Sequence, residues 1–288
     1  MEHLPHWFKI KIRMTPGENL SAVRRLVKDL NLHTVCEGAG CPNIWECWNQ
    51  GTATFMILGE VCTRDCGFCG VHKGRPLSVD EGEPLRVAMA VKALGLRHAV
   101  VTSVTRDDIE DGGASIFANI VREIRRLNPE TSVELLIPDF RGCDVALSTV
   151  LDTRPDILNH NMETVKRLYP EVRSQADYYQ SLRLLEKAKV SGIVTKSGLI
   201  LGMGETIDEI REVMVNLRAV GCEILTLGQY LRPSKNHRPV TRFYHPEEFD
   251  MLKMEGMEMG FRYIEAGPLV RSSYHAERQR LEARKTSP

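Results

Sequence analysis

Six of the eight cysteines in this chain fall in one stretch between Cys36 and Cys69. A disulfide framework would distribute its cysteines along the 288 residues, so this clustering indicates metal binding instead. Residues 33–54 are rich in Gly, Cys and Trp and show neither a helical nor a strand period, so we expect something other than apolar burial to order them, and metal ligation would suffice. Cys143 and Cys222 stand alone, and we expect both to be buried as small apolar side chains.

The composition argues for an ordinary globular enzyme or binding protein. Hydrophobic residues make up 42% of the chain, which suits one large α/β domain or two smaller ones. The 38 basic residues balance the 38 acidic ones, which gives no general attraction to nucleic acid or to an anionic membrane. No run approaches ~20 apolar residues and no targeting pattern opens the chain, so we expect a cytoplasmic protein. We expect it to bind neither nucleic acid nor a membrane.

From residue 55 onward, short apolar runs alternate with longer stretches of helical period, the pattern of β-α units around a parallel sheet. Six such strands predict an α/β fold, a partial (β/α)6 barrel of the TIM type. The expected strands, including a possible seventh, are 55–59, 98–104, 133–138, 156–159, 196–201, 223–230 and 262–266. The expected helices are 20–32, 84–94, 114–127 and 206–220.

The predicted barrel divides the chain into three segments. Residues 1–54 form an N-terminal extension with the first cysteines, residues 55–260 form the barrel, and residues 261–288 form a C-terminal segment. Beyond His275 the sequence is highly charged, and we expect this tail to be frayed.

A C-x3-C-x2-C triplet, Cys62, Cys66 and Cys69, follows the first predicted barrel strand. The chemistry of a parallel barrel gathers at the carboxyl ends of its strands. Three cysteines on a [4Fe–4S] cube leave one iron open to another ligand. The spacing alone also permits a zinc site with His72 as its fourth ligand.

With Phe68 before its last cysteine, this triplet resembles the radical S-adenosylmethionine (SAM) superfamily. The resemblance implies that Cys62, Cys66 and Cys69 hold a [4Fe–4S] cluster whose open iron chelates the amine and carboxylate of SAM. An injected electron then cleaves SAM to methionine and a 5′-deoxyadenosyl radical, which removes hydrogen from unactivated carbon.

A second triplet, Cys36, Cys41 and Cys47, has the spacing C-x4-C-x5-C. Together with the first triplet and the R-S-S-Y sequence at residues 271–274, it closely resembles the lipoyl synthase family over nearly the whole chain. The resemblance implies an auxiliary [4Fe–4S] cluster with Ser273 as its fourth ligand, Ser272 being the less favoured choice, and with Arg271 gating or positioning the serine. Because an alkoxide is a harder ligand than a thiolate, the iron bound to serine should be the easiest to release.

The same resemblance implies a reaction and its partners. Members of the family insert two sulfurs at C6 and C8 of an octanoyl chain in amide linkage to a lysine, with the auxiliary cluster as the sulfur source and one SAM radical per insertion. The implied substrates are octanoylated carrier domains of the glycine cleavage H protein and of 2-oxoacid dehydrogenase E2 subunits. The other implied partners are a low-potential electron donor such as ferredoxin or flavodoxin, and a carrier that repairs the spent cluster.

Three stretches resemble SAM-binding segments of relatives such as biotin synthase. Residues 159–164 match N-H-N-x-[DE]-T, which assigns Asn161 and Glu163 to the ribose, the less favoured alternative being a helix N-cap at Asn161. Arg173 matches an arginine on the SAM carboxylate, the alternative being a solvated surface side chain. Residues 198–206 match G-x-I-x-G-x-x-E, which assigns Ile200 and Leu201 to the adenine, although such glycines also occur in ordinary turns.

Other assignments are less specific. We expect residues 102–113 to contact the SAM amine through the backbone, and residues 229–234 with His237 to shape the octanoyl pocket. Residues 7–11 only loosely match the family, which leaves their part in carrier docking open, and Trp45 and Gly70 depart from its usual residues. The motifs leave open another radical SAM enzyme with an auxiliary cluster, such as a methylthiotransferase or a peptide-modifying maturase, and a non-enzymatic iron–sulfur carrier or zinc module.

Overall fold

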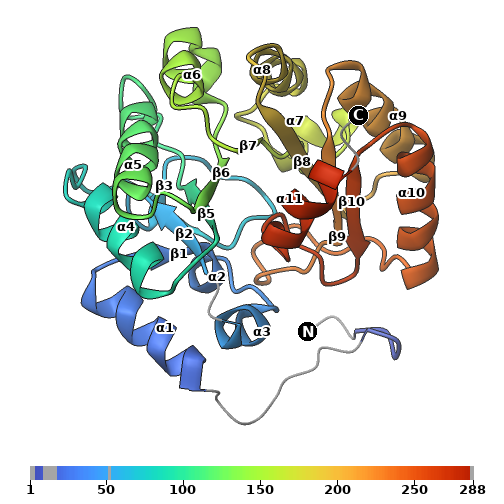
Figure 1. The fold of residues 1–288 in the computed structure, drawn as a ribbon. Helices are drawn as coiled ribbons and strands as arrows, with labels where there is room; N and C mark the ends of the chain where they lie inside the picture. The colour runs from blue at the N-terminus through green and yellow to red at the C-terminus, as the bar shows by residue number, and fades with distance from the viewer. Residues whose placement is uncertain (1–3, 9–17, 51–52, 286–288) are drawn as a thin grey trace. The chain divides into compact units, whose positions relative to one another are not determined.

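The computed structural model describes residues 4–8, 18–50 and 53–285 (Figure 1). Packing divides the chain into two compact parts. The first part comprises residues 12–65 and 70–158, and the second part comprises residues 1–11, 66–69 and 159–288.

The first part is built on parallel strands that follow one another in the sheet as they do in the chain. Strand β2 pairs with β5 and β5 pairs with β6, all in parallel, while β1 adds to β2 as an antiparallel edge. A separate short parallel pair, β3 with β4, lies at the two ends of the loop that carries the first triplet. These strands are β1 (His33–Thr34), β2 (Thr54–Ile57), β3 (Val61–Cys62), β4 (His72–Lys73), β5 (His98–Ser103) and β6 (Ser132–Leu136).

Amphipathic helices flank β5 and β6 in the first part (Figure 1). In α5, apolar residues such as Ile116, Ile120 and Ile124 are fully or almost fully buried, and the helix ends at the residue before Asn128 and Pro129. Against α5 packs α4. The helices of this part are α1 (Glu18–Asp29), α2 (Val35–Gly38), α3 (Ile44–Asn49), α4 (Glu83–Ala93), α5 (Ala114–Leu127), the 3-10 turn η1 (Phe140–Gly142) and α6 (Asp144–Leu151).

The second part repeats this design, with β8, β9 and β10 parallel and adjacent in chain order. Leu199, Leu225 and Leu227 from these strands enter one apolar cluster with the surrounding helices. Strand β7 (Ile157–Asn159) contains the boundary between the parts, because the second part begins at Asn159. The elements that follow are η2 (Lys166–Leu168), α7 (Tyr169–Val172), α8 (Tyr178–Val190), β8 (Val194–Leu201), α9 (Ile207–Ala219), β9 (Ile224–Gln229), α10 (Pro246–Glu258), β10 (Tyr263–Gly267) and α11 (Ala276–Lys285).

These elements confirm the predicted α/β class and its repeated β-α units. All seven expected strands are present with ends within two residues of the prediction. The expected helix 206–220 is α9, whose N-cap Thr206 accepts a hydrogen bond from Glu209 N at 3.2 Å in a capping box. In the segment 33–54, which shows no period, the described residues before β2 form the short elements β1, α2 and α3. Among the described residues, no helix is both long and apolar enough to cross a membrane.

Two expectations about individual segments were wrong. The described part of the tail beyond His275 is not frayed, because it forms α11, which buries Ala276, Gln279 and Ala283 on one face. Cys143 is exposed at the start of α6, whereas Cys222 is fully buried as expected.

In the first part, one buried carboxyl group links the start of α4 to the residue after β2. The side chain of Glu83, at the first turn of α4, accepts a hydrogen bond from Leu58 N at 2.8 Å. Burial raises the pKa of Glu83 from 4.5 to about 7. Because the folded state then holds this proton more tightly than the unfolded state, folding stability falls as pH rises from about 4.5 to about 7.

Replacing Glu83 with Gln should therefore stabilise the protein at pH 8 more than at pH 5, by on the order of 3 kcal/mol at most. Glutamine keeps an oxygen for Leu58 N but has no charge to bury. Urea unfolding of the cluster-free protein at both pH values measures the difference, with Glu110→Gln at an exposed position as the control. An equal effect of Glu83→Gln at both pH values would contradict the assignment.

Candidate active site

The second triplet lies in the first part, on two short helices and the loop between them. Cys36 is on α2, Cys41 is in the loop and Cys47 is on α3, and none is in a disulfide. The loop is closed by hydrogen bonds from Cys41 N to Cys36 O at 2.9 Å and from Cys47 N to Asn43 O at 3.0 Å. Burial raises the pKa of the Cys47 thiol to about 12, and the neighbouring Cys36 and Cys41 raise it further. The three thiols are therefore close enough to repel one another as thiolates.

These residues fit an iron–sulfur cluster. Burial also raises the pKa of Cys36, so its thiolate needs a compensating cation. Among the described residues, no three His, Cys, Asp or Glu side chains are close enough to hold a single metal ion. A cube holds its thiolates farther apart than one ion does, because the iron and sulfide atoms lie between them. His72, the alternative zinc ligand, is exposed on β4.

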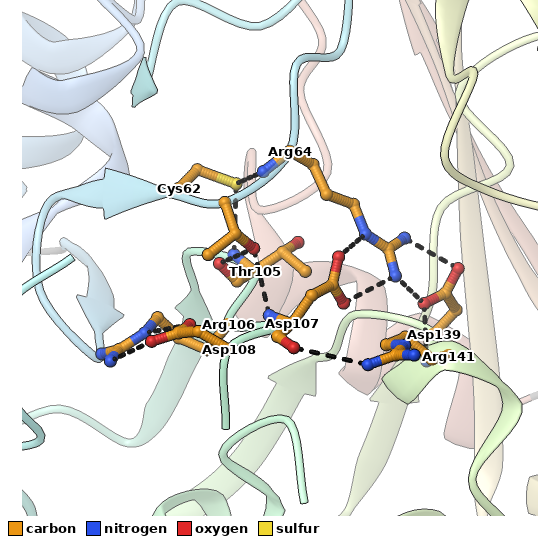
Figure 2. A network of polar contacts seen from close by, with 9 residues as sticks. Cys62, Arg64, Thr105, Arg106, Asp107, Asp108, Asp139 and Arg141 are labelled. Atoms are coloured by element: carbon orange, nitrogen blue, oxygen red, sulfur yellow. Dashed lines mark hydrogen bonds and ion pairs between the residues drawn. The ribbon is translucent and has the colours of Figure 1, made fainter. Parts of the chain in front are cut away.

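The first triplet follows β3. Cys62 ends that strand in the first part, and its sulfur accepts hydrogen bonds from Arg64 N at 3.4 Å and Thr105 N at 3.3 Å (Figure 2). Cys66 and Cys69 lie in the second part, with a hydrogen bond from Cys69 N to Cys66 O at 3.2 Å. None of the three is in a disulfide.

Asn161 and Glu163 interact directly after β7. Asn161 Nδ2 donates to Glu163 Oε1 at 3.0 Å, and Ser272 Oγ donates to Asn161 Oδ1 at 2.8 Å. No helix begins at Asn161, so the helix-cap alternative was wrong. Glu163 has a φ of 64°, and its backbone bridges to β8 by hydrogen bonds with Gly198 O and Ile200 N. Burial raises the pKa of Glu163, while Arg173 and Arg271 oppose this shift.

Arg173 is not the solvated surface side chain of the alternative interpretation. Its Nη1 donates to Asn161 O at 2.8 Å and to Met162 O at 3.1 Å. The guanidinium also lies 5.3 Å from the ring centre of Tyr169. The positive charge is thereby held beside the segment that carries Asn161 and Glu163.

Gly198 leaves room for the polar side chains around it. A Cβ at this position would lie 2.6 Å from Thr226 Oγ1, 2.9 Å from Asn161 Oδ1 and 3.2 Å from Ser272 Oγ. Two residues further along β8, Ile200 is half-buried, and Leu201 is buried in the apolar cluster.

The end of the G-x-I-x-G-x-x-E segment has a local role. The carboxylate of Glu205 accepts hydrogen bonds from Gly202 N at 2.5 Å and Met203 N at 3.0 Å. Gly202 has a φ of 114°, which an L side chain would rarely adopt. This part of the motif therefore stabilises the turn that follows β8.

The residues expected at an octanoyl pocket mainly support loops. Gln229 is fully buried, and its amide bonds to Tyr230 O, Arg242 O and Tyr244 N. His237 Nε2 lies 2.9 Å from the carbonyl oxygen of Cys69. The amide of Gln229 thus holds the loops around it, and the part of these residues in an octanoyl pocket stays a prediction.

The N-terminal residues pack within the second part. The ring of Trp7 lies 5.3 Å from that of His245, and Phe8 is buried against Phe243. Residues 9–11, the rest of the segment considered for carrier docking, lie outside the described residues.

One group of charged residues was missed by sequence reasoning. Arg64 lies inside the first triplet and forms ion pairs with Asp107 and Asp139 (Figure 2). The only signal in the sequence is that each residue follows a predicted strand, which places it at the carboxyl edge of the sheet but does not select its partner.

Comparison with known proteins identifies the class. The family model of the radical SAM superfamily matches residues 56–217. Solved structures with a similar fold include a methylornithine synthase (TM-score 0.56, 13% identity, 85% of this chain and 77% of that one) and a maturase of the [FeFe]-hydrogenase (TM-score 0.57, 12% identity, 93% and 72%). The chain is a member of the radical SAM superfamily, and its fold is the partial barrel of that class.

The particular family follows from closer relatives. A model for the N-terminal domain of lipoyl synthase matches residues 1–41. The lipoyl synthase of Rubrobacter xylanophilus is 56% identical over 98% of this chain and 88% of its own length, and that of Caldicellulosiruptor saccharolyticus is 54% identical over 95% and 96%. This chain belongs to the lipoyl synthase family. It is a radical SAM sulfurtransferase that uses [4Fe–4S] clusters and SAM.

The two serines of the R-S-S-Y sequence should separate in a mutational test. Ser272→Ala removes the donor to Asn161 Oδ1 and should weaken SAM binding about fivefold, the value of one ordinary hydrogen bond. Ser273→Ala should leave SAM binding unchanged and lower the iron retained by the auxiliary cluster.

Equilibrium dialysis with SAM and iron analysis of the reconstituted proteins measure the two effects. The serines serve as matched controls for each other. Equal loss of SAM affinity in both variants would contradict this separation.

Proposed function

We propose that this chain carries out the lipoyl synthase reaction with its two cysteine triplets in separate roles. Cys62, Cys66 and Cys69 would hold the SAM-binding [4Fe–4S] cluster. The second triplet and Ser273 would hold the auxiliary cluster. The observation that carries the proposal is the presence of both triplets, with no disulfide among them, in a chain 54–56% identical to lipoyl synthases over almost its whole length.

The choice of Ser273 as the fourth auxiliary ligand has support in the hydrogen bonding of its neighbour. The Ser272 hydroxyl is already directed at Asn161 Oδ1. The Ser273 hydroxyl makes no hydrogen bond to any of the described residues, which leaves its oxygen available to iron. Arg271 Nη1 donates to Val270 O at 2.7 Å and would position the serine backbone.

The SAM site would be formed by Asn161, Glu163, Arg173, Ile200 and Leu201. Asn161 and Glu163 supply an amide and a carboxylate side by side, a combination suited to the two ribose hydroxyls. Arg173 would place its charge toward the SAM carboxylate. Ile200 and Leu201 would support the adenine, Leu201 from within the apolar cluster.

When bound, SAM and the cluster of the first triplet supply the 5′-deoxyadenosyl radical that removes hydrogen from C6 and C8. The auxiliary cluster is a substrate in this scheme, because its sulfide is consumed. The protein must then hold the iron loosely enough for the cube to open. A serine oxygen suits that purpose, since it is a harder and more basic ligand than thiolate.

Membership of the family implies octanoylated lipoyl carrier domains as substrates. We further propose the glycine cleavage H protein and 2-oxoacid dehydrogenase E2 subunits as the carriers, ferredoxin or flavodoxin as electron donor, a cluster-repair carrier, and a cytoplasmic location. The segments 1–54, 55–260 and 261–288 would provide the auxiliary triplet, the radical SAM barrel and the serine ligand.

The division of roles predicts different losses for single cysteine variants. Cys66→Ala should abolish SAM cleavage, because it removes a ligand of the cluster that reduces SAM. Cys41→Ala should retain some cleavage and lose sulfur insertion. Quantifying 5′-deoxyadenosine and product after reduction measures both, with the exposed Cys143→Ala as control. Equal loss of cleavage in the Cys66 and Cys41 variants would contradict the division.

The direct test is mass spectrometry of an octanoyl-lysine carrier peptide incubated anaerobically with reconstituted protein, SAM and a strong reductant. The proposal predicts replacement of two hydrogens by two sulfurs, with two further hydrogens where the product is the reduced dithiol. Formation of 5′-deoxyadenosine without change in the peptide would overturn the proposed substrate while retaining the radical chemistry.

A further inference from the structure

Arg64 lies between the first two cysteines of the first triplet, yet its side chain is only 6% exposed. Its guanidinium donates to Asp107 from Nε at 2.7 Å and Nη2 at 3.0 Å. It also donates to Asp139 from Nη1 at 2.9 Å and Nη2 at 2.7 Å (Figure 2). One cation therefore joins the triplet loop to the loops that follow β5 and β6.

The geometry argues against a ligand-binding role for Arg64. An arginine side chain has five N–H donors, and four of those of Arg64 are directed at the two aspartates. Asp139 has no exposed side-chain surface and would be left buried without this cation. Arg64 is thus committed to holding its own loop.

The segment held by Arg64 directs two backbone amides at the Cys62 sulfur. Arg64 N lies 3.4 Å from Cys62 Sγ, and Thr105 N lies 3.3 Å from it. Thr63 joins the same two stretches, because its Oγ1 donates to Thr105 O at 2.9 Å and accepts from Asp107 N at 3.0 Å. The ion pairs and these hydrogen bonds fix both donors relative to the sulfur.

Hydrogen bonds to the sulfur ligands are one of the means by which a protein sets the potential of an iron–sulfur cluster. Each N–H places a partial positive charge beside a thiolate, and this stabilises the reduced, more negative state of the cluster. Loss of the donors therefore lowers the reduction potential.

We propose that Arg64 is a positioning residue that sets the reduction potential of the SAM-binding cluster by holding the amides of Arg64 and Thr105 on the Cys62 sulfur. The proposal rests on the assignment of Cys62 to that cluster under the proposed function. The contacts of Arg64 with Asp107 and Asp139 supply the fixed geometry, and the amides supply the electrostatic effect.

The test is a potentiometric titration of the reconstituted holoenzyme followed by electron paramagnetic resonance. Addition of SAM to a parallel sample identifies which signal belongs to the SAM-binding cluster. Arg64→Lys keeps the charge but cannot form both bidentate pairs, so the equilibrium constant for reduction of this cluster should fall about tenfold, or about 59 mV for one electron. Asp139→Asn should shift it in the same direction.

Arg141→Lys is the matched control, because Arg141 is exposed and, among the described residues, its guanidinium donates to Asp107 O alone, at 3.4 Å. This variant should leave both potentials unchanged, and Arg64→Lys should leave the auxiliary potential unchanged. A folded, iron-replete Arg64→Lys protein with an unshifted SAM-responsive potential would overturn the proposal.

A measurement on the wild-type protein tests the inference even if the variants do not fold or do not bind their clusters. Pulsed electron paramagnetic resonance with ¹⁵N-labelled threonine should detect a nitrogen coupled to the SAM-responsive cluster, as expected for Thr105 N. Absence of that coupling overturns the inference while the proposed function stands. Absence of any SAM-responsive cluster overturns both.

Discussion

The site depends on the cost of burying sulfur that must carry charge. Cys36 is buried and Cys47 half-buried, and burial raises the pKa of both thiols. Without iron these thiols stay protonated, whereas Trp48 on α3 is fully buried and fixes that helix by apolar packing. Under the proposed function, iron would supply the positive charge that these buried thiolates need, so cluster binding should further stabilise residues 33–50.

Ser272 and Ser273 show how one backbone turn can contribute to both the proposed SAM site and the proposed auxiliary cluster. Ser272 is directed at Asn161, which itself donates to Glu163, while the hydroxyl of Ser273 makes no hydrogen bond to a described residue. Gly198 makes this arrangement possible, because a side chain there would displace Asn161 Oδ1. Ser272, which holds a proposed SAM ligand, and Ser273, the proposed iron ligand, are therefore adjacent in the chain.

The strands, most helices and the two triplets could be predicted because their signals are local in the sequence. Apolar periodicity gave the α/β units, and residue type with spacing gave the cysteine chemistry. The pairing of Arg64 with Asp107 and Asp139 could not be predicted, since it joins three loops. The positions of these loops along the strand direction depend on strand register. The last helix was missed because a stripe of only Ala276, Gln279 and Ala283 is hidden among charges, and the exposure of Cys143 shows that an isolated cysteine need not be buried.

The ordered structure of α11 has a consequence for an enzyme that consumes its auxiliary cluster in each reaction. The turn at residues 271–274 is closed by Tyr274 N donating to Arg271 O at 2.9 Å, and it is held between β10 and α11. Its serines therefore have few conformations to lose when iron binds. Under the proposed function, the Ser273 hydroxyl would keep its position after the sulfide has been spent, so a new cluster could bind between turnovers without refolding of this turn.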